Sequence, residues 1–102
     1  MHIEFSRSGG FAGIRLVASV DTEDLPADQA SSLNQLIREA EFFGLPEKLA
    51  PEKPAPDRFE YQLTIKASEK SHSVVVNDAA APESLRPLLN YLTTLAMVRR
   101  RS

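Results

Sequence analysis

Residues 58–66 read Arg58-Phe59-Glu60-Tyr61-Gln62-Leu63-Thr64-Ile65-Lys66, and apolar and polar side chains alternate here more regularly than elsewhere in the chain. An alternation with a period of two predicts a β-strand that has one face against a core and the other in solvent. A polar turn, Ser68-Glu69-Lys70, and the valine-rich residues 71–77 come next. We therefore expect these two segments to form a β-hairpin.

A second hairpin is predicted at the start of the sequence. Apolar residues alternate with polar ones in residues 2–7 and again in residues 14–20. The connection between them is the run Ser8-Gly9-Gly10-Phe11-Ala12-Gly13, which holds three of the four glycines. A tight turn needs only one or two residues with the conformational freedom of glycine, so this loop has more than closure of a hairpin requires.

Two segments have the spacing of amphipathic helices. Apolar residues recur every three or four positions in residues 30–40, after Pro26, and again in residues 85–96, where Pro87 suits a first turn. The predicted order of elements is ββαββα. The sequence therefore predicts a single α+β domain over residues 1–102, with a four-stranded antiparallel sheet of two hairpins and two helices packed against it.

The segment that follows the first helix is rich in aromatic residues and then in proline. We expect Phe42 and Phe43 to close the helix and Gly44 to stop it. Residues 46–57 hold four of the seven prolines, Pro54 among them, and proline has no N–H for a central strand. This segment is predicted to be an extended, semi-rigid connection, either a plain linker or a second contact surface.

Composition excludes several classes of function. The chain has 102 residues and a net charge of −2, with no basic field of the kind that nucleic-acid binders carry. It has no cysteine, so disulfides, thiolate catalysis and cysteine-bound metals are excluded. We see no signal peptide and no apolar run near the ~20 residues that cross a bilayer, so we expect a cytoplasmic protein that binds neither nucleic acid nor membrane.

Catalytic and metal-binding patterns are weak in this sequence. His2 and His72 are the only histidines, and they do not have the spacing of a zinc site. No serine lies in a G-x-S-x-G elbow, and the glycine run lacks both phosphate-binding patterns. We expect a protein that is not an enzyme and has no metal or cofactor.

The run Arg7-Ser8-Gly9-Gly10-Phe11-Ala12-Gly13-Ile14-Arg15-Leu16 resembles the emfourin family. The resemblance extends through Asp21…Leu25-Pro26, Phe42-Phe43…Leu45-Pro46, Asp57-Arg58-Phe59…Tyr61 and Leu85-Arg86-Pro87-Leu88. It runs essentially from end to end, and the Ser-Gly-Gly-Phe-Ala-Gly block is its most specific part. Emfourins are small protein inhibitors of thermolysin-like zinc metalloproteases such as protealysin. The resemblance therefore implies a protease partner and tight binding in the cleft of that protease.

The same resemblance suggests how the glycine-rich loop would bind. Thermolysin-like enzymes favour a bulky apolar residue just after the scissile bond. We hypothesise that residues 8–13 (Ser8, Gly9, Gly10, Phe11, Ala12 and Gly13) form the protease-binding loop, with Phe11 in that pocket and the Gly10 carbonyl near the zinc. The alternative is an ordinary hairpin loop whose Phe11 folds back onto the core.

Other surfaces are open candidates. Residues 46–57, including Pro54, are a rival epitope, and the charged residues beside either loop are secondary contacts: Arg7, Arg15, Arg58 and Glu60. The alternative function is a protein-interaction module that inhibits no protease. The sequence leaves open the target protease, the affinity, any contact with the zinc and the oligomeric state.

Overall fold

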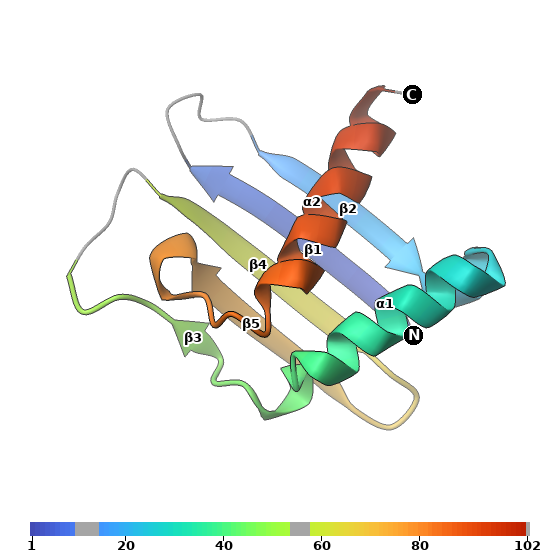
Figure 1. The fold of residues 1–102 in the computed structure, drawn as a ribbon, viewed down its shortest axis with the longest axis horizontal. Helices are drawn as coiled ribbons and strands as arrows, with labels where there is room; N and C mark the ends of the chain where they lie inside the picture. Colours follow the sequence, from blue (N-terminus) through green and yellow to red (C-terminus); the bar gives the residue numbers. More distant parts are fainter. Residues whose placement is uncertain (10–14, 54–57, 102) are drawn as a thin grey trace.

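Five strands form one sheet in the order β2-β1-β4-β5-β3 (Figure 1). The structure is a computed structural model that describes residues 1–9, 15–53 and 58–101. The strands are β1 (His2–Gly9), β2 (Leu16–Asp21), β3 (Lys48–Leu49), β4 (Phe59–Lys66) and β5 (Ser71–Asn77), and the helices are α1 (Ala27–Glu39) and α2 (Arg86–Arg101). Three short 3₁₀ turns lie at Thr22–Asp24, Phe42–Gly44 and Asp78–Ala80.

Both predicted hairpins are present, and they are joined through their first strands. β1 is antiparallel to β2 on one side and to β4 on the other. The β1–β4 register runs without a break from His2 opposite Lys66 to Gly9 opposite Phe59. β1 is thus an internal strand that is paired along both edges, so it is held more firmly than an edge strand such as β2.

The prediction of four antiparallel strands is wrong in one detail, because the sheet has five strands and is mixed. Lys48 and Leu49 run parallel to β5, and the Val75 N–H donates to the Glu47 carbonyl at 2.8 Å. Proline keeps the surrounding segment out of a central strand. The residues between Pro46 and Pro51 retain their N–H groups, however, and can pair at a sheet edge.

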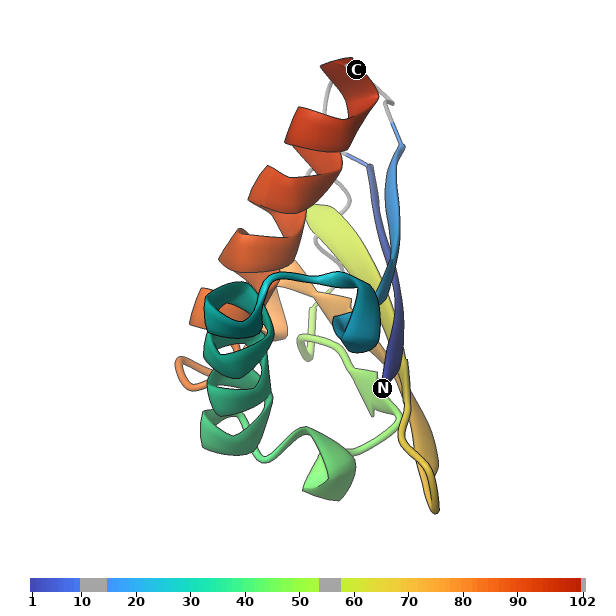
Figure 2. The same ribbon diagram turned by 90° about the vertical axis from the view of Figure 1, so that its right-hand side faces the viewer.

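Both helices cover the same face of the sheet, as Figure 2 shows. α1 buries Leu33 and Ile37, and α2 lies beside β2 and contributes Leu88, Leu92 and Ala96 to the core. The inward side chains of the strands complete that core: Ile3, Phe5, Leu16, Ala18, Val20, Tyr61, Leu63, Ile65, Val74 and Val76. No helix among the described residues is long and apolar enough to span a membrane.

The end of α1 differs from the prediction. We expected the helix to include Phe42 and Phe43 and to stop at Gly44, but it stops at Glu39, and Glu41 takes a left-handed conformation (φ 50°). Phe42 then lies in the 3₁₀ turn, fully buried, with its ring 5.4 Å from that of His72. Continuing the helix through Phe42 would lose this contact, so burial of the ring outweighs the strain of order 1 kcal/mol at Glu41.

Candidate functional site

The end of β1 and the start of β4 are paired, and each adjoins one of the two candidate contact segments in the chain. The second segment, residues 46–57, begins at the other edge of the sheet, where Lys48 and Leu49 form β3. Gly9 is opposite Phe59 and Ser8 is opposite Glu60, so residues 10–14 continue from the point in the sheet where residues 54–57 end. Gly10, Phe11, Ala12, Gly13 and Pro54 lie outside the described residues. The two segments that looked like rivals in the sequence therefore have a common base, which we call the loop end of the sheet.

Position 9, the last residue of β1, requires a glycine. Its φ of +92° is a conformation that other residues rarely adopt, and an added Cβ would lie 2.9 Å from the Arg58 carbonyl oxygen. The close approach of two backbones at Gly9 and Arg58 thus fixes the spacing of the two segments at their base.

Arg7 covers the core at the loop end. It lies on the same face of β1 as the buried Phe5, and its guanidinium carbon is 4.0 Å from the centre of the Phe59 ring. This is a cation–π contact, worth about 0.5–1 kcal/mol at a partly exposed site. The Arg7 Nε is buried without a hydrogen-bond partner among the described residues. Arg7 therefore closes the core with its stem and leaves a positive charge beside the loops.

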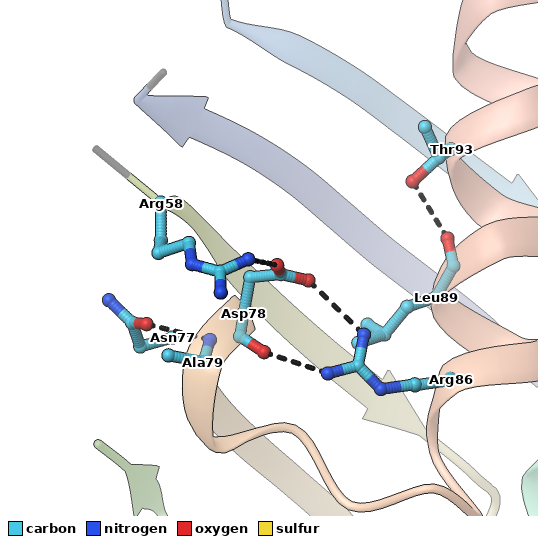
Figure 3. A network of polar contacts seen from close by, with 7 residues as sticks. All are labelled: Arg58, Asn77, Asp78, Ala79, Arg86, Leu89 and Thr93. Carbon is cyan, nitrogen blue, oxygen red and sulfur yellow. Dashed lines mark hydrogen bonds and ion pairs between the residues drawn. The ribbon is translucent and has the colours of Figure 1, made fainter. Parts of the chain in front are cut away.

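Two further arginines share one carboxylate nearby (Figure 3). Arg58 Nη1 is 3.3 Å from Asp78 Oδ2, and Arg86 Nη1 is 3.4 Å from Asp78 Oδ1. Arg86 Nη2 also donates to the Asp78 carbonyl at 3.0 Å. The Asp78 side chain is only 19% exposed, whereas those of Arg58 and Arg86 are 59% and 47% exposed. The carboxylate is thus covered and the two guanidinium groups face solvent.

The local backbone holds Asp78 in this position. Asn77 ends β5, and its side chain accepts a hydrogen bond from the Ala79 N–H at 2.9 Å, which starts the 3₁₀ turn that carries Asp78. Arg86 is the first residue of α2. Neither Asp78 nor Arg86 was among the predicted contacts, because they lie 20 and 28 residues from Arg58 and no local pattern links the three.

Tyr61 lies under this group of charges. It is 6% exposed and its ring centre is 6.1 Å from that of Phe5. Burial raises the pKa of the Tyr61 hydroxyl, the negative charge of Asp78 raises it further, and the positive charges of Arg7 and Arg86 oppose the shift. Tyr61 is thus a neutral core residue at physiological pH, and the charges of Asp78, Arg7 and Arg86 all act on it.

The remaining predicted contacts lie on the uncovered face of the sheet. Ser8 and Glu60 are exposed and opposite each other there. Arg15 is exposed just before β2 and lines a shallow hollow of about 140 Å³ with Glu4, Ser6, Val17, Gln62 and Thr64. The described secondary contacts therefore fall into two groups, with Arg7 and Arg58 toward the helices and Arg15 and Glu60 on the opposite face, where Ser8 of the predicted binding loop also lies.

A serine, a histidine and a glutamate also meet on the uncovered face, but not as a catalytic triad. Glu4 Oε1 and Ser19 Oγ both contact the same ring nitrogen of His2, Nε2, and Ser19 donates to Glu4 Oε1 at 3.0 Å. In a triad the carboxylate and the hydroxyl contact opposite nitrogens of the ring. Hydrogen bonds from His2 and then from Ser19 lower the pKa of Glu4.

Metal binding finds no support in the described part of the chain. There, no three His, Cys, Asp or Glu side chains gather in a way that could hold a metal ion. The second histidine, His72, is structural: its Nε2 lies 2.7 Å from the Leu45 carbonyl oxygen, and its ring packs on Phe42.

Comparison with known proteins gives one match. The family model Emfourin matches residues 5–93. A search of curated proteins and a search of solved structures found no match. The matched range includes the second half of β1 from Phe5, the loop end of the sheet, Asp78 and Arg86.

Proposed function

The chain belongs to the emfourin family, and we propose on that basis that it inhibits thermolysin-like zinc metalloproteases of the protealysin type. In this proposal the loop end of the sheet blocks the active-site cleft by tight binding, and residues 8–13 with Phe11 make the main contact. The protein acts as a binding partner and not as an enzyme. The cytoplasmic location expected from the sequence stays a prediction.

The observation that carries the proposal is the pairing of Gly9 with Phe59. A cleft blocker has to present a narrow segment from a base that does not yield when the protease closes on it. β1 supplies such a base, because it is paired with β2 and β4 on both edges and packs through Phe5 onto the core. A base that is rigid before binding lowers the entropy cost of association.

An interaction module without inhibitory activity is the alternative. The observation that favours it is the position of β2 at the edge of the sheet, with the exposed Val17 on the uncovered face. An edge strand can pair with an extended segment of another protein and leave any active site untouched.

Titration of a purified thermolysin-like protease with this protein tests the proposal. We expect stoichiometric loss of protease activity, and a Phe11→Ala variant that binds at least about 30-fold more weakly, the effect of losing an aromatic hot spot. Met97→Ala is a matched control, because Met97 is an exposed apolar residue of α2 and not one of the predicted contacts. We expect it to inhibit like the parent.

Three other outcomes are informative. If Phe11→Ala inhibits as well as the parent, the function stands and the main contact moves to residues 46–57. If the parent inhibits none of several such proteases, the proposal is wrong. Recovery of a partner that is not a metalloprotease, in a complex broken by a Val17→Asp change in β2, would support the interaction module.

A further inference from the structure

Among the described residues, the loop end of the sheet carries more positive than negative charge, although the chain as a whole is acidic. The net charge of the chain is −2. At the loop end, however, the guanidinium groups of Arg58 and Arg86 contact one carboxylate, that of Asp78, and the guanidinium of Arg7 lies over the Phe59 ring. Glu60, the nearest other acid among the described residues of β4, lies on the uncovered face of the sheet, and Asp57, next to Arg58 in the sequence, lies outside the described residues.

Most of the hydrogen-bonding capacity of these arginines is unused within the described residues. A guanidinium has five N–H donors. Arg58 makes one contact of 3.3 Å to Asp78, and its side chain is 59% exposed. Arg86 is half exposed, and the Nε of Arg7 has no partner in the described part of the chain. Asp78 therefore orients Arg58 and Arg86 without saturating either.

We infer that Arg58 and Arg86, oriented by Asp78 beside Arg7, form a cationic rim that receives a carboxylate side chain of the partner protein. This inference rests on the proposed function, since the rim lies at the base of the segments proposed to enter the protease cleft. Two guanidinium groups that already converge on one carboxylate have the planar, forked geometry that recognises a second. The rim acts mainly on the rate of association, because exposed charges steer an encounter more than they hold a complex.

Association kinetics test the rim through Arg58. We expect Arg58→Gln to slow association with a thermolysin-like protease about two- to fivefold at low ionic strength, the range of an exposed ion pair. The difference should vanish near 1 M salt, where the Debye length is about 3 Å. Arg58→Lys keeps the charge and should keep most of the rate.

A matched control and a variant of opposite sign separate steering from a folding defect. Arg38→Gln removes the same charge from an exposed position of α1 that lines a hollow near the β4–β5 turn. We expect it to slow association less than Arg58→Gln does. Asp78→Asn removes the negative charge from the rim and should accelerate association. Equal rates for Arg58→Gln, Arg38→Gln and the parent, or slower association of Asp78→Asn, would overturn the inference while inhibition itself stands.

A measurement without protease decides the question even if no protease is inhibited. Titration with a short oligoglutamate peptide, followed by NMR of the arginine Nε–H signals, should shift Arg58 and Arg86 and leave Arg38 unchanged. Equal shifts at all exposed arginines, or none at Arg58 and Arg86, would refute a carboxylate-binding rim. Failure of the parent to inhibit would instead refute the proposed function.

Discussion

The two ends of the sheet are built in different ways. At the loop end, β1 ends at Gly9 and β4 begins at Phe59. Charged side chains lie around the buried residues next to these two positions. At the opposite end, the β4–β5 hairpin closes within a few residues, and the Ala67 N–H donates to the Lys70 carbonyl at 2.8 Å. We call this second end the closed end.

Contacts between aromatic rings dominate the closed end. Phe42 contacts Phe43 edge to face at 5.6 Å, and the Lys70 ammonium lies 4.8 Å from the centre of the Phe43 ring. This group and the C-terminal part of α1 together line a hollow of about 630 Å³. This difference indicates that the closed end contributes mainly to stability and the loop end mainly to recognition. Substitutions at the closed end should therefore leave recognition nearly intact, and most substitutions at the loop end should leave stability nearly intact.

The largest effect is expected from Phe42→Ala at the closed end. Phe42 is 1% exposed, and loss of a buried phenylalanine costs about 3–5 kcal/mol. Chemical denaturation should show this decrease, whereas protease inhibition, measured where the variant is still folded, should be unchanged. Phe43→Ala is the matched control with a smaller loss, because that side chain is only partly buried. Lost inhibition in folded Phe42→Ala would show that the two ends are coupled.

Gly9→Ala is the exception to this division and should lower both stability and inhibition, because Gly9 belongs to the sheet and also to the base of the loops. The positive φ of Gly9 and the 2.9 Å approach of the added Cβ to the Arg58 carbonyl predict a loss of about 1–3 kcal/mol in the free energy of unfolding. They also predict weaker inhibition, because β1 and β4 have to separate at the base of the loops.

Gly44→Ala is the matched control for Gly9 at the closed end. An added Cβ at Gly44 meets no atom within 4 Å, and the backbone is not in the left-handed region. Relief of unfolded-chain entropy should leave this variant as stable as the parent or more stable by about 0.4–1 kcal/mol. A Gly9→Ala variant as stable as Gly44→Ala would contradict the close backbone approach.

How much the sequence reveals also differs between the ends. The alternation in residues 2–7, 14–20 and 59–66, the valine-rich residues 71–77 and the helical spacing predict four of the five strands and both helices, because those signals are local. The Arg58–Asp78–Arg86 cluster could not be predicted, because the fold brings together three segments that are distant in the sequence: the start of β4, the turn after β5 and the start of α2. β3 was missed because two residues are too few for a periodic pattern. The chain reversal at Glu41 was missed because tertiary burial of Phe42 decides it.

Alkaline pH should weaken the fold through Tyr61. Its pKa is raised in the folded state, so the unfolded chain loses the proton first. The contribution to stability is complete below the ordinary tyrosine pKa of about 10 and decreases as the pH rises through the folded value. As the pH is raised above about 10, the denaturation midpoint of the parent should therefore decrease, and that of Tyr61→Phe should decrease less. Tyr91→Phe, on α2, is the control that should keep the fall of the parent.

The smallest effect is expected at acid pH from Glu4. His2 and Ser19 lower the pKa of Glu4 below 4.5 in the folded state, so its contribution is present above that value and is lost as the pH falls through the folded pKa. In the Ser19→Ala variant, NMR titration of the Glu4 carboxyl should show a higher pKa, because the variant lacks the hydrogen bond that lowers the Glu4 pKa second to that of His2. Because Glu4 lies on the exposed face, the loss of stability should be slight and screened by salt. A large acid transition that disappears in Glu4→Gln would mean that the uncovered face, and not the ends of the sheet alone, stabilises the fold.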